Sequence, residues 1–209
     1  MTRRLASART LAARRRRVAA IAVAGTGLLG ASFAAEPDSA EFYRLTLATA
    51  ATWTLGGSAL GTDTDKPERP VLAPVLIGAG TFVVFYGCAL IARRIPFLRK
   101  AIAGVLQYAE RGPTPPVLLI TLANGAAEEI FFRGAVYSVA GRHPVLVSTG
   151  IYACSTAATR NPALVLASVL MGTLFGVQRR ATGGIQAPLL THLTWSILIL
   201  HYLPRLFRS

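Results

Sequence analysis

Charged residues are scarce in this sequence, and their scarcity argues against an ordinary soluble domain. Only 15% of the 209 residues are Asp, Glu, Lys or Arg, whereas soluble domains usually contain about a quarter. Hydrophobic residues make up 53% of the chain, and the mean hydropathy is +0.49. A soluble chain of this length would not need so much apolar sequence to bury one core. The composition therefore predicts an integral, polytopic membrane protein whose first partner is the lipid bilayer.

Cysteine and internal repeats are also lacking. The two cysteines, Cys88 and Cys154, lie in apolar runs without CxxC spacing. This spacing predicts no disulfide framework, and we interpret both as small core residues. No repeat is visible, which argues against a transporter that would use intramembrane charges as a relay, because many transporter folds are built from repeats.

Acidic residues are few as well: 9 Asp and Glu stand against 22 Lys and Arg, which gives a net charge of +13. Seven arginines fall within the first 17 residues, and six of the other basic residues flank apolar runs as pairs, namely Arg93–Arg94, Arg99–Lys100 and Arg179–Arg180. Such residues orient spans and contact anionic headgroups. Because no aromatic-basic groove pattern accompanies them, they predict no nucleic-acid partner. The arginine-rich start predicts a cytoplasmic N-terminus in a bacterial-type plasma membrane.

The apolar residues form about seven segments, which predict an all-α, polytopic transmembrane helical bundle of about 7 spans. A segment that mixes basic and apolar groups, 93–116, interrupts them and ends in the helix-breaking RGPTPP. Two of the segments open with proline, a favoured first helical residue. The apolar segments are 18–34, 42–60, 71–92, 117–137, 144–160, 162–178 and 184–203.

Two features of the N-terminal half leave alternatives open. The basic start, apolar core and small residues near Ala34 also describe a cleavable signal peptide. We favour an uncleaved first span, because its apolar core is long and further spans follow. Strict alternation of spans would place the basic residues 93–100 outside, against the positive-inside rule. Either an early segment fails to cross, or residues 95–110 lie along the interface as an amphipathic helix.

Three charges interrupt the segment 117–137, within the stretch NGAAEEIFFRGAVYSVAG. Each charge costs about 2.5–3.5 kcal/mol at the centre of a membrane helix. Glu129 and Arg133 are four residues apart and can pair along one helix face. Glu128 is turned by about 100° from Glu129, so it lies on another face without that partner. Such a carboxylate, desolvated and unpaired, is suited to take a proton from water. The structural alternative is that all three charges brace neighbouring helices.

A second polar group lies in the last segment, where His192 and Ser196 are four residues apart on one helix face. A neutral imidazole and a hydroxyl can donate hydrogen bonds to a developing oxyanion. A lone core histidine is also commonly structural. The other histidines, His143 and His201, lie near predicted helix ends, where interfacial solvation is the expected role.

These residues resemble the type II CAAX prenyl endopeptidase and bacteriocin-processing (CPBP) family of glutamate-type intramembrane proteases. The EExxxR motif is present from Glu128 to Arg133 and is followed by Gly134, and GGIQAPLLTH, residues 183–192, is similar to the final motif. The resemblance covers roughly residues 116–200. It implies that Glu128 is the base that activates water, together with a histidine from a middle motif, FxxxH. It also implies that Glu129 and Arg133 support the base, and that His192 belongs to the oxyanion site.

The sequence departs from the family pattern at two positions. Residues Tyr152 to Thr156 align with the middle motif FxxxH, so Thr156 stands where a water-orienting histidine is expected. Ser196 stands where asparagine or aspartate is expected. A hydroxyl can orient water or donate to an oxyanion, but it cannot accept a proton as imidazole does. Loss of a positioned acid–base group typically costs about 10²–10⁴-fold in rate. Tyr152 and Ser155 supply further hydroxyls nearby.

The sequence thus predicts a basic N-terminal part with accessory helices, 1–115, and a CAAX-protease-like transmembrane core, 116–203. The predicted activity is hydrolysis of a peptide bond in a peptide or a membrane-anchored protein, without a cofactor. A catalytically impaired homologue that binds a membrane peptide or protein is the alternative. No metal is expected, because zinc sites generally need three protein ligands and the motif histidine is missing. Prenylation of the substrate and the oligomeric state stay open.

Overall fold

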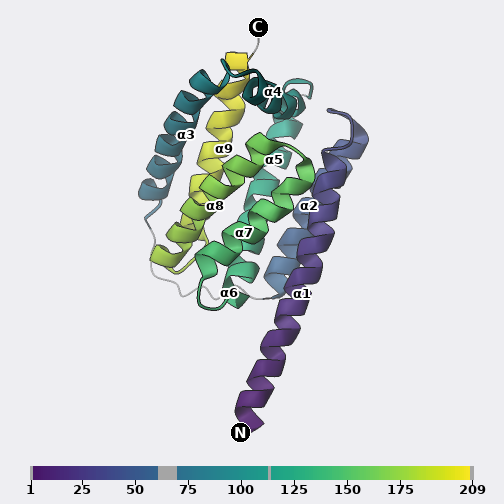
Figure 1. The fold of residues 1–209 in the computed structure, drawn as a ribbon, viewed down its shortest axis with the longest axis vertical. Coiled ribbons are helices and arrows are strands. Elements are labelled where there is room, and N and C mark those ends of the chain that lie inside the picture. Colours follow the sequence, from purple (N-terminus) through teal and green to yellow (C-terminus); the bar gives the residue numbers. More distant parts are fainter. Residues whose placement is uncertain (1, 61–69, 113, 208–209) are drawn as a thin grey trace.

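The computed structural model describes residues 2–60, 70–112 and 114–207, and every regular element in those ranges is helical (Figure 1). This confirms the predicted all-α class. The elements are α1 Thr2–Ser32, α2 Ala40–Ala59, α3 Leu72–Ala92, α4 Pro96–Glu110, α5 Thr114–Glu128, a π-helical segment η1 Glu129–Val136, α6 Tyr137–Val139, α7 Pro144–Thr156, a 3-10 turn η2 Ala157–Thr159, α8 Pro162–Thr182 and α9 Gln186–Phe207.

The long helices run up and down along one bundle, and the two chain termini lie at opposite ends (Figure 1). α3 packs against α9, α7 against α8, and α1 against α2. α4 lies at the end of the bundle near the C-terminus, in contact with α5, α8 and α9. Its 15 residues are about 22 Å long at 1.5 Å per residue, and it lies at the end of the bundle instead of running along it with the long helices. This favours the expectation that residues 95–110 form a helix that does not cross.

Several predicted boundaries differ from the observed ones. α1 begins at Thr2 and continues through the arginine run, and α9 extends to Phe207 with Pro204 inside its last turns. The segment predicted as one helix, 117–137, changes to π-helical geometry at Glu129. The expected prolines at the starts of α7 and α8 are confirmed.

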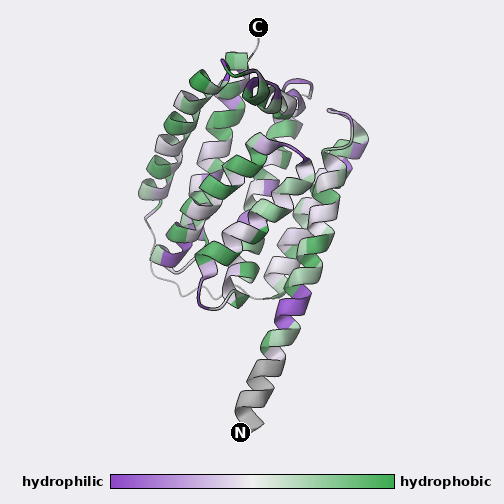
Figure 2. Cartoon of the chain, viewed as in Figure 1, coloured by the Kyte–Doolittle hydropathy of each residue, from purple (hydrophilic) through white to green (hydrophobic). Residues whose placement is uncertain are grey.

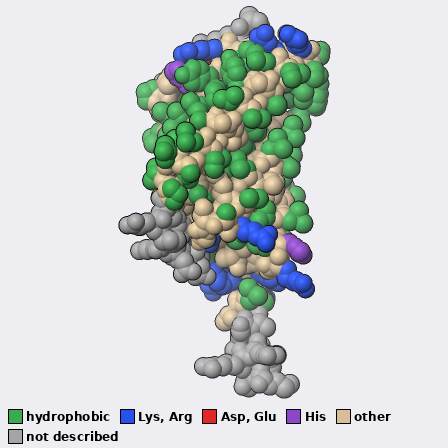
Figure 3. Space-filling view, turned by 90° about the vertical axis from the view of Figure 1, so that its left-hand side faces the viewer, with side chains coloured by type: hydrophobic (Ala, Val, Ile, Leu, Met, Phe, Trp, Pro, Cys, Tyr) green, Lys and Arg blue, Asp and Glu red, His purple; other side chains and the backbone are tan. Residues whose placement is uncertain are grey.

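Two helices among the described residues, α3 and α8, are long and apolar enough to cross a membrane. Only 11% of the apolar window of α3 is buried, so α3 is not the core helix of a soluble protein. Apolar side chains cover the middle of the face shown in Figure 3, and Lys and Arg side chains gather at its two ends. Which helices cross a membrane, and how many do so, stays a prediction.

The interpretation of the cysteines as core residues was wrong. Cys88 on α3 and Cys154 on α7 are both exposed. In a bundle whose outer surface is apolar, an apolar run does not separate inward from outward positions, because both carry hydrophobic side chains.

The core forms around Trp53 of α2, which is fully buried against two aromatic residues of η1. Its ring centroid lies 6.3 Å from that of Phe131 and 5.1 Å from that of Phe132. α1 approaches closely at Gly25, where a Cβ atom would lie only 2.0 Å from Trp53 Nε1. Because only Ile130 separates the two phenylalanines from the acidic pair, this packing fixes the backbone that carries Glu129.

α4 is attached to the bundle by two side chains. Asn161 caps α8 by accepting hydrogen bonds from the amides of Ala163 and Leu164, and its own amide donates to the Ala101 carbonyl of α4 at 2.7 Å. Tyr108 of α4 donates to the carbonyl of Phe33 at 2.8 Å. α4 is therefore held over the end of the bundle by hydrogen bonds with the segment that follows α1 and with the residue that caps α8.

Two substitutions at Asn161 separate these roles. Asn161→Asp keeps the oxygen that caps α8 but loses the amide donor to Ala101. We expect faster hydrogen–deuterium exchange in residues 96–110 with an unchanged start of α8. Asn161→Ala should also loosen residues 162–166, at a cost of about 1 kcal/mol for the lost cap. Unchanged exchange of α4 in both variants would contradict this attachment.

Candidate active site

The acidic pair lies where α5 ends and η1 begins, at Glu128 and Glu129. Single turns of π-helix are rare and are often found at functional sites. Glu129 and Arg133 are both fully buried, and Arg133 Nη1 lies 3.3 Å from Glu129 Oε1. The predicted pairing of these two residues is confirmed.

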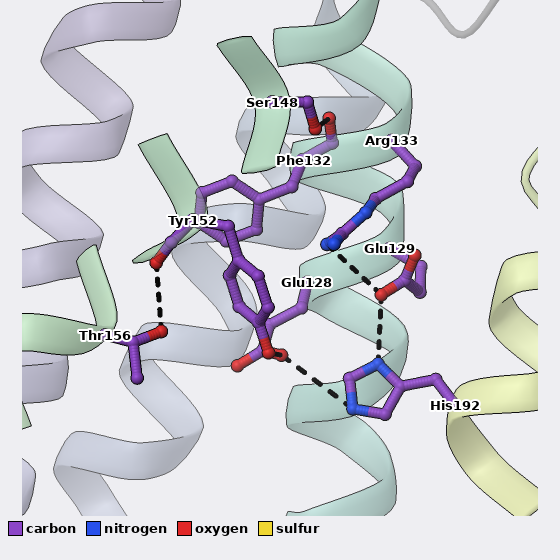
Figure 4. A network of polar contacts seen from close by, with 8 residues as sticks. All are labelled: Glu128, Glu129, Phe132, Arg133, Ser148, Tyr152, Thr156 and His192. Atoms are coloured by element: carbon purple, nitrogen blue, oxygen red, sulfur yellow. Dashed lines mark hydrogen bonds and ion pairs between the residues drawn. The ribbon is translucent and has the colours of Figure 1, made fainter. Parts of the chain in front are cut away.

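Glu128 makes a different set of contacts (Figure 4). Its Oε2 accepts a hydrogen bond of 2.6 Å from the Tyr152 hydroxyl of α7. The same oxygen lies 3.9 Å from Nε2 of His192, which is carried by α9. A hydroxyl–carboxylate bond this short belongs to the charge-assisted class, which is about twice as strong as a neutral one. The carboxylate is thus fixed by residues of two other helices.

His192 joins the two glutamates through its two ring nitrogens. Nδ1 lies 3.0 Å from Glu129 Oε1, and Nε2 faces Glu128. The ring stacks on Phe175 with centroids 4.7 Å apart, and a Cβ atom at Gly125 would lie 3.5 Å from it. The two carboxylates leave the helix in different directions, as predicted, but sequence reasoning missed that one imidazole connects them.

Arg133 is enclosed rather than hydrogen-bonded. Its guanidinium carbon lies 4.6 Å from the ring centroid of Tyr152 and 5.1 Å from that of Phe175. Its Nε, Nη1 and Nη2 have no hydrogen-bond partner among the described residues. Two aromatic faces and the Glu129 carboxylate therefore stabilise this buried cation.

A cavity of about 270 Å³ adjoins these residues and extends to α4. The predicted site residues Glu128, Thr156, His192 and Ser196 line it, together with Tyr152. The remaining walls are mostly apolar side chains of α1, α2, α4, α5, α8 and α9. Glu129 and Arg133 do not line the cavity, because both are fully buried behind His192. The site therefore consists of residues that line the cavity and of an ion pair that supports His192 from behind.

The two departures from the family pattern are both buried at the cavity. The Thr156 hydroxyl donates to the Tyr152 carbonyl of its own helix at 2.9 Å, so its hydrogen is directed at the backbone. Ser196 lies one turn beyond His192 on α9 and is 6% exposed. The hydroxyl that contacts Glu128 is that of Tyr152. Sequence reasoning noted Tyr152 only as a nearby hydroxyl. The feature that could have identified its role is that tyrosine replaces the phenylalanine of the middle motif.

Three further polar atoms of cavity-lining residues are buried without a hydrogen-bond partner among the described residues. They are Oγ1 of Thr46, Oδ1 of Asn124, one turn before Glu128, and Nε1 of Trp195. An acceptor and a donor at the cavity wall are suited to the N–H and C=O groups of an extended peptide. Among the residues that the structure describes, no group of three or more His, Cys, Asp or Glu could hold a metal ion.

Comparison with known proteins identifies the region that carries this site. Residues 110–198 match the family model described as type II CAAX prenyl endopeptidase Rce1-like. No curated protein and no solved structure matches the chain. The matched region contains the acidic pair, the middle motif and His192, and the family is membrane-embedded. The region that carries the candidate site, residues 110–198, is therefore similar to the Rce1-like family of type II CAAX prenyl endopeptidases.

Proposed function

We propose that this protein is a glutamate-type intramembrane endopeptidase that hydrolyses a peptide bond in a peptide or a membrane-anchored protein. The observation that carries the proposal is the Glu128 carboxylate, which faces an apolar cavity between the Tyr152 hydroxyl and Nε2 of His192. A carboxylate shielded from bulk water and held in one orientation is suited to general-base catalysis.

In the proposed reaction, a water molecule next to Glu128 attacks the carbonyl carbon of the scissile bond. Glu128 takes one proton of this water while the new C–O bond forms. When the tetrahedral intermediate collapses, the C–N bond breaks and Glu128 returns the proton to the leaving nitrogen. The products are a carboxylate and an amine, so the water is consumed and Glu128 is regenerated.

Donors for the negative oxygen of the intermediate lie on the same side of the cavity. Nδ1 of His192 is engaged with Glu129, so Nε2 is the ring atom that faces Glu128 and the cavity. In the imidazolium form, its N–H group can donate to an oxyanion. The hydroxyls of Tyr152 and Ser196 also line the cavity. Removal of one such donor typically costs about 10²–10³-fold in rate.

The same proposal places the bundle in a bilayer with seven crossings, namely α1, α2, α3, α5 with η1, α7, α8 and α9. α4 then lies at one membrane surface. Exposed apolar residues such as Leu72, Val83 and Ile91 on α3 support this arrangement, because they would otherwise face water. With the arginine-rich start in the cytoplasm, α4 and the nearby end of the cavity would lie at the opposite face.

A catalytically impaired homologue that binds a membrane peptide or protein is the second candidate. One observation favours it: Thr156, at the position of the motif histidine, gives its hydrogen bond to a backbone carbonyl. No imidazole therefore stands at the place where the family pattern has one, and Tyr152 cannot take a proton from water near neutral pH.

The Thr156→His substitution distinguishes the two candidates. We expect the wild type to cleave a fluorogenic peptide library in lipid nanodiscs, and Thr156→His to cleave it about 10²-fold faster, because an imidazole can orient and polarise the water. His192→Ala should abolish cleavage in both backgrounds. Silence of the wild type with activity in Thr156→His would identify a binding protein derived from an enzyme. Silence of both proteins would contradict the endopeptidase.

A further inference from the structure

A second hollow lies on the bundle, remote from the candidate active site. It is a groove of about 330 Å³ between α1, the end of η1, α6 and α7. Its walls are apolar and include Ala19 and Ala22 of α1, Val136 of η1, and Val147 and Ile151 of α7. Among the described residues that line it, the only charged one is Arg15.

The charge and the apolar wall are successive positions of one helix face. Arg15, Val18, Ala19 and Ala22 follow the i, i+3, i+4, i+7 spacing along α1. Arg15 therefore lies at one end of the groove, with small apolar residues following it along the helix. Figure 2 shows the hydrophilic run on α1 at the level where the rest of the bundle ends.

Arg15 is fixed in this position although it is exposed. Its Nε donates to the Val139 carbonyl at 3.0 Å. Its Nη2 lies next to Gly141, where a Cβ atom would be 3.4 Å away, and the φ of +78° at this residue suits glycine. The bond to Val139 uses one of the five N–H groups of the guanidinium, so the others can bind an anion. Arg142, which follows Gly141, is also exposed on this rim.

We propose that this groove binds an anionic phospholipid, with one acyl chain along the apolar wall and the phosphate on Arg15. The apolar wall favours a hydrocarbon chain over water, and the guanidinium suits a phosphate oxygen pair. Exposed Arg142 adds positive charge on the same rim, which complements an anionic headgroup. The site does not involve Glu128 or His192, so it is independent of the proposed hydrolysis.

The test is native mass spectrometry of the full chain, released from detergent after incubation with equal amounts of phosphatidylglycerol and phosphatidylcholine. We expect the wild type to retain one phosphatidylglycerol in preference to phosphatidylcholine. Arg15→Gln should reduce this preference about fivefold, the factor that corresponds to about 1 kcal/mol per basic residue near an anionic surface. Arg16→Gln is the matched control, because Arg16 is exposed on the same helix but does not line the groove.

A second pair of variants tests the acyl chain. Ala19→Trp fills the groove and should abolish retention of the lipid, whereas Ala24→Trp, at an exposed position outside the groove, should not. Equal retention of both lipids by the wild type would overturn the proposal. So would equal losses in Arg15→Gln and Arg16→Gln, or in the two tryptophan variants. A dimer lost only in Ala19→Trp would instead assign the groove to a second copy of the chain.

Discussion

Replacement of Glu128 by glutamine is expected to lower peptide hydrolysis by about 10²–10⁴-fold while the protein stays folded. The amide has nearly the same shape as the carboxylate, and its oxygen can still accept the hydrogen bond of Tyr152. It cannot take a proton from water. The measurement is the single-turnover rate of peptide cleavage by purified protein in lipid nanodiscs, with substrate affinity determined separately by fluorescence anisotropy.

Two further variants give this experiment its controls. Glu128→Asp keeps the base but withdraws it by one methylene, and a misplacement of about 1 Å can cost about 10²-fold. Glu36→Gln removes a carboxylate at an exposed position and should leave the rate unchanged. The expected order of rates is wild type and Glu36→Gln, then Glu128→Asp, then Glu128→Gln. A Glu128→Gln variant as active as the wild type would exclude Glu128 as the base.

Local spacing was sufficient to predict the parts of the site that lie on one helix. The ion pair of Glu129 and Arg133 follows from an interval of four residues, and it forms although the helix is π-helical there. The separate direction of Glu128 follows from the turn of about 100° between neighbours. The helical segments themselves follow from apolar runs that are interrupted by proline, glycine and basic residues.

Contacts between side chains of different helices could not be predicted from the sequence. The bond from Tyr152 to Glu128 joins α7 to α5, and the bridging position of His192 depends on how α9 packs against both glutamates. Such contacts are fixed by helix crossing and side-chain rotamers, which a periodic pattern does not specify. The exposed positions of Cys88 and Cys154 illustrate the same limit, because an apolar run does not indicate which side faces the core.

The supporting ion pair leads to the second large effect, on stability. Arg133→Met should lower the free energy of unfolding by about 3–5 kcal/mol, because it leaves the Glu129 carboxylate fully buried without its cation. The cation also lies over the rings of Tyr152 and Phe175, and methionine restores only the apolar part of these contacts. The measurement is the thermal unfolding midpoint in detergent, followed by tryptophan fluorescence, with an expected fall of about 10 °C.

The double variant Glu129→Gln with Arg133→Met tests whether charge is the cause. With both charges removed, no uncompensated ion is buried, and the glutamine amide can still pair with Nδ1 of His192. We therefore expect the double variant to recover most of the lost stability, since replacement of a whole buried pair is often nearly neutral. Arg94→Met, at an exposed position, controls for the loss of one positive charge. A double variant as unstable as Arg133→Met would show that Arg133 stabilises the bundle through its aromatic contacts rather than through Glu129.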